Sequence, residues 1–420
     1  MAIADGHNEQ CTIFAQTERS SQIHLDDAEV QPKITQKRSG CVMKNVQWKK
    51  VKLGDLISDS YAGGTPNRAR NDYFGGDIPW VSSGEVNNPI IDSTIENITQ
   101  VGLNNSSARW IPENSILLAL YGATAGQVSM LKIRATANQA VLAIIPNNEV
   151  VDTRFLFYQI FHNKQSLLFL AQGSGQPNLS KSIVDRLDIS YPDSLPAQRR
   201  IAAILSTADK VIEQTRQLIG KYKSIKQGMM EDLLKPKEGW KKVKLGDIGK
   251  ISMCKRIFSF ETTTEGEIPF YKIGTFGKTA DAFISRQLYE EYKSKFSYPK
   301  VGDILISASG TIGRTVVYDG EPAYFQDSNI IWIDNDEQIV VNEYLYYLYM
   351  TISWNLEGST IARLYNDNFN RIEISVPDLL EQHHIAKRLA VIDKKIEAEE
   401  KVLEKYEKMK KGLMERLLNE

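Results

Sequence analysis

Two stretches of this chain place apolar residues at alternating spacings of four and three. Residues three and four apart share one face of a helix, so this spacing is typical of the seam of a coiled coil. We therefore predict one long helix over residues 196–237 and another over residues 380–420. The predicted seam consists of Ile201, Leu205, Ile212, Ile219, Tyr222 and Leu233 in the first helix and Ile385, Leu389, Ile396, Leu403, Tyr406 and Leu417 in the second.

Polar residues interrupt the two seams at matching positions, Thr215 and Lys226 in the first helix and Glu399 and Lys410 in the second. A polar residue in a seam lowers stability but can fix the register of the helices. Helices of about 37 residues, which are roughly 55 Å long at 1.5 Å per residue, can pair antiparallel within one chain. Two alternatives remain: an ordinary bundle inside one compact fold, and dimerisation with another chain.

The segment before each long helix has short apolar runs that lead into turns containing Gly, Thr or Asn. Runs of this kind are typical of strands. An apolar helix is predicted after each set of strands, over residues 153–171 and 342–357. These patterns predict two mixed α/β domains, at residues 47–195 and 238–379. The predicted strands cover residues 115–120, 127–133, 139–146, 303–307, 314–318 and 329–333.

The two halves of the chain repeat one another, a pattern that indicates duplicated structural units. The octamer WKKVKLGD occurs at residues 48–55 and again at 240–247. Residues 198–234 align without gaps onto 382–418, with 16 of 37 positions identical. The predicted fold is therefore α+β: two similar α/β domains separated by two long antiparallel coiled-coil helices, in a pseudo-twofold tandem repeat.

The formal net charge of the chain is −1, so a strongly basic character, the usual sign of nucleic-acid binding, is absent. The first long helix carries nine Lys and Arg against four Asp and Glu over residues 196–237. The second domain carries fifteen against nineteen over residues 240–379. Any DNA-binding surface must therefore be built from local clusters.

Three widely separated cysteines, Cys11, Cys41 and Cys254, fit neither a disulfide framework nor a metal site, which predicts a cytoplasmic location. No apolar run is long enough to span a membrane. Residues 1–46 match nothing in the second half of the chain. We predict a disordered extension there, or an artefact of annotation if translation begins at Met43.

The order of domain, helix, domain and helix resembles the specificity subunits of type I restriction–modification enzymes over nearly all of residues 47–420. The resemblance rests on WKKVKLGD in both halves and on GGTPNRARNDYFGGDIPWVSSGEV at 63–86. It also rests on GSGQPNLSKSIVDRLDISYP at 173–192 and on the helix beginnings PAQRRIAAIL and LEQHHIAKRL. The second half departs from the first, because EGEIPFYKIGTF at 265–276 lacks GGTP. Its DNA half-site is therefore expected to differ.

The resemblance implies a protein without a catalytic centre, in which each domain is a target recognition domain for half of a bipartite DNA sequence. The long helices would set the spacer between the half-sites. They would also dock two methyltransferase subunits, which carry S-adenosylmethionine, and restriction subunits, which use ATP and Mg²⁺, would join that core. No cofactor and no metal is expected on this chain itself.

Candidate DNA contacts are polar and basic residues in turn-rich loops, since Arg pairs well with guanine and Asn or Gln with adenine. A solvated loop side chain is the alternative at every position. The candidates in the first domain are Thr65, Asn67, Arg68, Arg70, Ser83, Tyr121, Thr124, Gln127, Gln176, Asn178 and Lys181. Those in the second domain are Arg256, Lys272, Lys278, Ser309, Thr311, Arg314, Arg363, Asn366 and Asn368.

Catalytic motifs are weak or missing. GTFGKT at 274–279 would need a glycine at Lys272 to form a phosphate loop, and no methyltransferase motif of the NPPY kind occurs. A coiled-coil scaffold and a stand-alone bipartite DNA-binding protein, such as a repressor, remain as rival functions. A scaffold has no need of two divergent, loop-rich domains.

Overall fold

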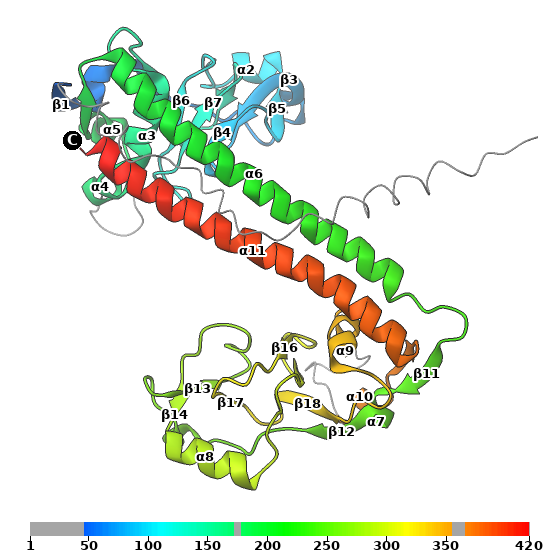
Figure 1. The fold of residues 1–420 in the computed structure, drawn as a ribbon. Coiled ribbons are helices and arrows are strands. Elements are labelled where there is room, and N and C mark those ends of the chain that lie inside the picture. The colour runs from blue at the N-terminus through cyan, green and yellow to red at the C-terminus, as the bar shows by residue number, and fades with distance from the viewer. Residues whose placement is uncertain (1–45, 172–177, 355–365, 420) are drawn as a thin grey trace, which may run out of the picture. The chain divides into compact units, whose positions relative to one another are not determined.

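A computed structural model describes residues 46–171, 178–354 and 366–419 (Figure 1). The chain divides into two compact units between Arg200 and Ile201. The first unit contains the domain that we call head 1, residues 48–192. The second unit contains the first long helix from Ile201 onward, the whole second long helix and the domain that we call head 2, residues 241–376. The predicted N-terminal extension lies outside the described residues except for Val46.

Each head begins and ends in a two-stranded antiparallel ribbon. In head 1, β1 (Trp48–Lys52) pairs with β10 (Asp188–Pro192). In head 2, β11 (Lys241–Lys244) pairs with β19 (Glu373–Val376). Both ribbons join the duplicated WKKVK segment to the duplicated segment that precedes the long helix. The repeated octamer therefore supplies one strand of the pair that closes each head.

Two further sheets build head 1. A five-stranded sheet has the order β2-β9-β6-β7-β4, and a three-stranded sheet has the order β5-β3-β8. The apolar runs of β6 and β9 are buried on both faces, as expected for central strands. The strands are β2 (Ile57–Ala62), β3 (Phe74–Val81), β4 (Ile90–Ile91), β5 (Glu96–Ile98), β6 (Ile116–Ala119), β7 (Val128–Leu131), β8 (Thr136–Ala137) and β9 (Val141–Pro146).

Head 2 has the same plan with one strand fewer. A four-stranded sheet has the order β12-β18-β15-β16, and a three-stranded sheet has the order β14-β13-β17. Strand for strand, these correspond to β2-β9-β6-β7 and β5-β3-β8 of head 1. The strands are β12 (Gly249–Ser252), β13 (Ile268–Tyr271), β14 (Phe283–Ile284), β15 (Ile304–Ser307), β16 (Thr315–Val317), β17 (Tyr324–Phe325) and β18 (Ile330–Asn335).

The helices within the heads are short. The helix predicted over 153–171 is divided at Asn163, whose backbone leaves the helical region and whose side-chain amide donates to the Gln159 carbonyl at 2.9 Å. The helix predicted over 342–357 ends at Tyr349. The helices are α2 (Gln100–Asn104), α3 (Thr153–His162), α4 (Lys164–Leu170), α5 (Lys181–Asp185), α7 (Leu245–Ile248), α8 (Arg286–Lys295), α9 (Asn342–Tyr349) and α10 (Asn366–Asn370).

The two long helices, α6 (Leu195–Leu233) and α11 (Leu379–Leu418), run side by side in opposite directions (Figure 1). Ion pairs fix this direction, because partners later in α6 lie earlier in α11. Arg216 contacts Glu407 at 2.6 Å, and Lys223 contacts Glu400 at 2.8 Å. All twelve predicted seam residues are buried or half-buried. The helices thus form an antiparallel coiled coil within one chain.

The repeat makes these ion pairs equivalent. Arg216 and Glu400 are 184 positions apart, and so are Lys223 and Glu407. Exchanging the two helices therefore places the Arg216–Glu407 contact on the Glu400–Lys223 contact. The order of the charges is reversed, because the cation Arg216 corresponds to the anion Glu400. The coiled coil has a pseudo-twofold relation between its own halves.

A buried glutamine near the start of each long helix joins that helix to the segment of chain before it. The Gln198 side chain accepts from the Asp152 N–H at 2.7 Å and donates to the carbonyls of Val150 and Pro192. Gln382 accepts from the Val341 N–H at 2.9 Å and donates to the carbonyls of Ile339 and Pro377. Each amide satisfies three backbone groups that would otherwise be buried without partners.

In head 2, both long helices contribute to the hydrophobic core. Met230 and Leu234 of the α6 end lie in one buried cluster with Ile385 and Leu389 of α11. Side chains of α9, among them Tyr344, complete the same cluster. Burying side chains of this size contributes about 1.5–3 kcal/mol each. The coiled coil is therefore fixed to head 2 through shared core packing.

Candidate nucleic-acid interface

In head 1, four loops meet at one edge of the sheets. The carboxyl ends of β2 and β6 and the amino ends of β7 and β9 share this edge because these strands alternate in direction. Backbone bonds join the loops: the Gly64 N–H donates to the Ala137 carbonyl at 2.8 Å, and the Asn138 N–H donates to the Val81 carbonyl at 2.9 Å. We call this edge the head-1 rim. It comprises residues 63–70, 82–84, 120–127 and 138–140.

Head 2 has an equivalent edge. The Gln326 N–H donates to the Tyr271 carbonyl at 2.9 Å, which matches the bond from Asn138 to Val81. The Ala308 N–H donates to the Asn329 carbonyl at 2.8 Å, which matches a bond from Leu120 to Ala140. We call this edge the head-2 rim. It comprises residues 253–262, 272–278, 308–314 and 326–329.

The GGTP motif has a steric cause in head 1. A Cβ on Gly63 would lie 2.2 Å from the Ala137 carbonyl oxygen, and one on Gly64 would lie 2.3 Å from the Ala108 backbone nitrogen. Only glycine permits the first rim loop to cross so close to two neighbouring backbones. Head 2 has Met253 and Cys254 at the start of the corresponding loop, so it lacks the glycines that such close crossings require. The difference in sequence between the two heads therefore affects the first loop of each rim.

Two predicted arginines of the head-1 rim hold carboxylates of their own head. Arg68 forms a two-bond pair with Glu96, and its guanidinium lies 4.4 Å from the centre of the Phe74 ring. Arg70 forms two bonds of 2.8 Å with Asp72, and this contact lowers the pKa of the Asp72 carboxyl. These guanidiniums are oriented but already paired. Bidentate binding to guanine would require each of them to exchange its carboxylate partner.

The other head-1 candidates lie along the rim or beside it. Thr65 donates to Gln139 across two rim loops, and the Asn67 side chain accepts from the Ala69 N–H in a local turn. Asn178 precedes Leu179, whose N–H donates to the Leu120 carbonyl at 2.8 Å. Ser83, Tyr121, Thr124 and Gln127 stand in rim loops, Lys181 pairs with Asp185 on α5, and Gln176 is outside the described residues.

Most head-2 candidates are held by partners within their own head. Arg256 contacts Asp327 at 2.8 Å and so joins the first rim loop to the turn before β18. Ser309 donates to Asn329 at 2.7 Å. Arg314 donates to the Phe276 carbonyl at 2.9 Å. Lys272 pairs with Asp281, Lys278 is exposed, and Thr311 accepts through its carbonyl from Ser307.

Three head-2 candidates fall near or beyond the limits of the described residues. Asn368 is exposed on α10. Arg363 lies outside the described residues, and the side chain of Asn366 is not among those described. Contact of any of these candidates with DNA stays a prediction.

Sequence reasoning missed several rim residues. Gln139, Asp327 and Asn329 stand in the turns between β8 and β9 and between β17 and β18, where their side chains bind predicted candidates. Their place in the sequence could have identified these residues, because each of these turns directly precedes a buried central strand.

The lysines of the duplicated WKKVK strand contact their own head. Lys49 pairs with Asp193 at 2.8 Å, and Lys52 pairs with Asp188 at 2.7 Å. The Asp193 carboxylate raises the pKa of Lys49. These pairs offset positive charge that would otherwise be available to phosphates.

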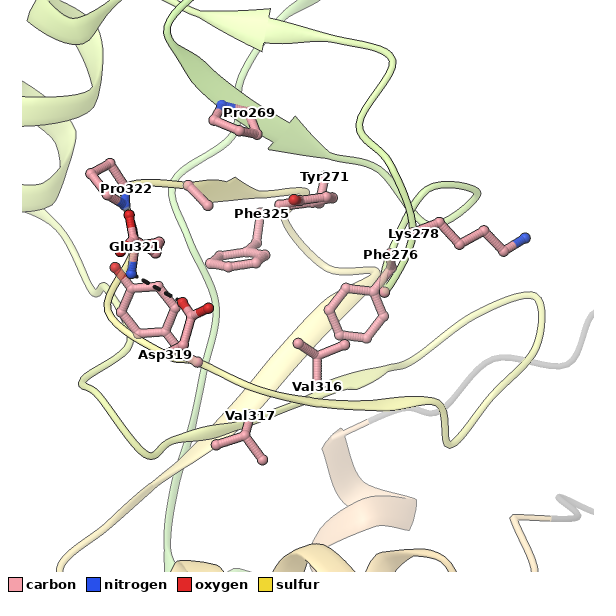
Figure 2. A pocket seen from close by; sticks show the side chains of 13 residues that line it. Pro269, Tyr271, Phe276, Lys278, Val316, Val317, Asp319, Glu321, Pro322 and Phe325 are labelled. Carbon is pink, nitrogen blue, oxygen red and sulfur yellow. Dashed lines mark hydrogen bonds between the residues drawn. The ribbon is translucent and has the colours of Figure 1, made fainter. Parts of the chain in front are cut away.

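Head 2 also contains an open cavity of about 250 Å³ (Figure 2). Tyr271 and Phe325 stack in its wall with ring centres 5.9 Å apart, and Phe276 and Val316 extend this apolar surface. Figure 2 shows Lys278 pointing away from the rings, whereas Asp319 lies among the lining residues. An apolar wall with a nearby carboxylate suits an uncharged planar or apolar group better than a phosphate.

The described parts of the two heads contain no metal-binding cluster beside these rims. Across residues 46–171, 178–354 and 366–419, no three His, Cys, Asp or Glu side chains are grouped as metal ligands would be. In the same ranges, no helix has the length and apolarity needed to cross a bilayer.

Comparison with known proteins decides the family. A sequence model described as the type I restriction modification DNA specificity domain matches residues 45–221 and again residues 237–408. The chain belongs to the type I restriction–modification specificity subunits. The two matches fall on the two halves of the internal repeat, so the specificity subunit carries two such domains in tandem. Subunits of this family recognise DNA and are not catalytic.

Individual relatives agree with this assignment. A putative type I restriction enzyme specificity subunit of Haemophilus influenzae is 46% identical over 261 residues, which cover 60% of this chain and 66% of the relative. The MjaVIII specificity subunit of Methanocaldococcus jannaschii is 28% identical over 405 residues, which cover 88% of this chain and 92% of the relative.

Solved structures share the fold. The specificity subunit of Mycoplasma genitalium superposes with a TM-score of 0.60 at 17% identity, covering 89% of this chain and 96% of that chain. A chain from a structural study of assembly in the type I system gives 0.55 at 18% identity, covering 88% and 97%. The tandem heads and the antiparallel helices are therefore the fold of this family.

Proposed function

We propose that this specificity subunit reads an asymmetric bipartite DNA sequence, with one half-site for each head. The observation that carries the proposal is the equivalence of the two rims, which share strand order and backbone bonds but differ in side chains. The head-1 rim presents Arg68 and Arg70, whereas the head-2 rim presents Arg256 beside Phe258 and Phe260. Side chains on equivalent loops with different chemistry suit two different half-sites.

The coiled coil is proposed to set the spacer between the half-sites. A helix of 39 residues is about 58 Å long, which exceeds the 34–36 Å of one turn of duplex DNA. The ion pairs between α6 and α11 favour one register of the two helices. A rod of fixed register can therefore hold the spacer at a constant length.

The partners of the subunit are proposed from its family. Two methyltransferase subunits would dock on the coiled coil, whose two repeated helix segments offer two related surfaces. Restriction subunits would complete the complex. S-adenosylmethionine would be bound by the methyltransferase subunits, and ATP and Mg²⁺ by the restriction subunits. The complex would work in the cytoplasm.

Methylation mapping tests this function. The full-length subunit is co-expressed with its methyltransferase subunit, and methylated adenines are mapped across the host genome. We expect one bipartite motif with two unlike halves and a constant spacer. Exchange of head 2 for the head of another specificity subunit should change one half only. A motif without two separable halves would contradict the proposal.

The stand-alone DNA-binding protein stays as the rival. It predicts tight binding to one operator by the subunit alone and no stable complex with a methyltransferase. Co-purification with the methyltransferase subunit separates the two functions.

A further inference from the structure

Two phenylalanines of the head-2 rim stack on each other in solvent. The rings of Phe258 and Phe260 are 5.6 Å apart between centres and inclined by 5°, so they are nearly parallel. Phe258 is 50% exposed and Phe260 is 83% exposed. Single exposed apolar residues are common, but a stacked and protruding pair is an apolar patch that calls for an explanation.

The loop that carries the pair is held in place. Glu261 accepts from the Phe258 N–H at 2.7 Å through its side chain, and the Glu261 N–H donates to the Phe258 carbonyl at 3.0 Å. The Thr262 hydroxyl donates to the Ser259 carbonyl at 2.9 Å. Ile257, directly before the pair, is buried in the head-2 core. The rings are thus presented from a fixed base.

Two cationic residues stand close to the pair in the sequence, and the Glu261 carboxylate that holds the Phe258 N–H is also beside it. Lys255 and Arg256 directly precede Ile257, and the Lys255 ammonium lies 5.2 Å from the centre of the half-exposed Phe296 ring. Arg256 remains 60% exposed at its side chain although it contacts Asp327. Aromatic faces beside cations suit a ligand that combines flat apolar surfaces with negative charge. Stacked base pairs with their phosphates have both properties.

The position of the loop gives an independent argument. It follows β12, the strand that corresponds to β2 of head 1. The loop after β2 carries Arg68 and Arg70, so the same place in the two heads presents guanidiniums in one and aromatic rings in the other. The pair therefore stands at the place in head 2 where head 1 carries its two candidate base-reading arginines.

We propose that the Phe258–Phe260 pair is a wedge that enters the base stack within the half-site of head 2 and unstacks one base step. The inference rests on the proposed function. Apolar side chains that insert between base pairs partially unstack and kink the duplex. Head 2 would then read the deformability of a step in addition to base edges, and flexible pyrimidine–purine steps would be favoured there.

The test uses the full-length subunit with its methyltransferase subunit and a duplex carrying the mapped site. 2-Aminopurine replaces one base at a time in the half-site that changes when head 2 is exchanged. With the wild-type protein, fluorescence should rise at one step, because the probe loses its stacking partner. In the F258A/F260A variant this rise should disappear, and binding should weaken about 10- to 100-fold. An F258W/F260W variant, which keeps flat rings, should retain the rise.

Val301 provides the matched control. It is 71% exposed in head 2 and lies before the amino end of β15, at the edge opposite the rim. Val301→Ala should leave both fluorescence and affinity unchanged. Because all three side chains are exposed, none of the variants should alter the midpoint of thermal unfolding.

Two results would overturn the wedge while leaving the proposed function intact. One is unchanged unstacking and affinity in F258A/F260A. The other is loss of the methyltransferase subunit from F258A/F260A with unstacking preserved, which would identify the pair as a protein contact. Failure of the proposed function looks different, because the wild-type protein itself would then show no preference for the mapped duplex.

Discussion

The Lys226 ammonium lies 2.7 Å from the Asp393 carboxylate, and Lys410 makes the same contact with Asp209 at 2.5 Å. Lys226 and Lys410 are 184 positions apart, and so are Asp209 and Asp393. The coiled coil therefore contains the same cross-helix contact twice. Lys226 and Lys410 are two of the four polar interruptions predicted in the seams; both are half-buried, and each contacts a carboxylate on the opposite helix.

Separating Lys226 from Asp393 should destabilise the coiled coil. The Lys226 side chain is only 17% exposed, so removal of its partner leaves a poorly hydrated charge. Asp393 also accepts from the Tyr347 hydroxyl at 2.8 Å. We expect Lys226→Met and Asp393→Asn each to cost about 1–2 kcal/mol of unfolding free energy. A double-mutant cycle in urea, followed by circular dichroism, should give a coupling of about 1 kcal/mol or more.

The exposed pair of Lys401 and Glu397 on α11 is the control for this cycle. Both partners lie one turn apart on one helix in water, so their coupling should stay below about 0.5 kcal/mol. An equally small coupling between Lys226 and Asp393 would show that the seam lysine does not fix the register.

The glutamines at the beginnings of α6 and α11 should be equally important. Gln198→Leu and Gln382→Leu each remove three hydrogen bonds to buried backbone groups, and we expect each to cost about 3 kcal/mol. Thermal unfolding followed by tryptophan fluorescence measures the loss. His383→Ala, at an exposed neighbouring position, should have little effect. A large loss at only one glutamine would show that the two dockings are not equivalent.

Variants of each rim should alter one half-site alone. Arg256→Ala removes the cation that joins two loops of the head-2 rim, and Thr65→Val removes the contact with Gln139 in head 1. Loss of a specific base contact reduces discrimination at one position by about 1–3 kcal/mol. Methylation mapping should show a relaxed base in the head-2 half for Arg256→Ala and in the head-1 half for Thr65→Val. Changes in both halves from either variant would refute independent reading.

Cys254 should resist alkylation until head 2 unfolds. The side chain is buried, and desolvation raises the pKa of its thiol to about 12. Above pH 9 the thiol of the unfolded chain loses its proton while the buried thiol keeps its own, and this difference favours unfolding. The contribution of the thiol to stability is therefore complete below pH 9 and declines as the pH rises from 9 towards 12. In a variant with Cys11→Ser and Cys41→Ser, iodoacetamide at pH 8 should label the protein only in denaturant. Labelling of the native protein would contradict the burial.

Much of the architecture was predictable because it depends on periodicity and repetition. The 4-3 spacing from Ile201 to Leu233 indicated the seam, and the repeated octamer indicated two similar heads. The partners of Lys226 and Lys410 were not predictable, since Asp393 and Asp209 lie outside the seam pattern. Their assignment needs the register of the two helices.

The rims were predictable only as loops. The sequence indicated Arg68 as a candidate, but its pairing with Glu96 depends on the antiparallel contact of β3 with β5. Phe258 and Phe260 gave no signal, because periodicity does not distinguish exposed from buried aromatics in an irregular segment. Position within the strand order, which only the structure provides, makes these residues comparable with Arg68 and Arg70.

The central claim is that the coiled coil sets the spacer while the heads set the half-sites. Gly220 of α6 and Glu404 of α11 are 184 positions apart, and each lies between the two sets of cross-helix ion pairs. Inserting residues into one helix alone would disturb the register on one side. Seven residues inserted after both positions keep every ion pair and the 4-3 pattern, and they lengthen the rod by about 10 Å.

Methylation mapping of this doubly extended subunit, co-expressed with its methyltransferase subunit, tests the claim most directly. We predict that both half-sites stay the same and that the spacer grows by about three base pairs, at 3.4 Å per base pair. An unchanged spacer, or half-sites that change with the length of the rod, would contradict this division of roles.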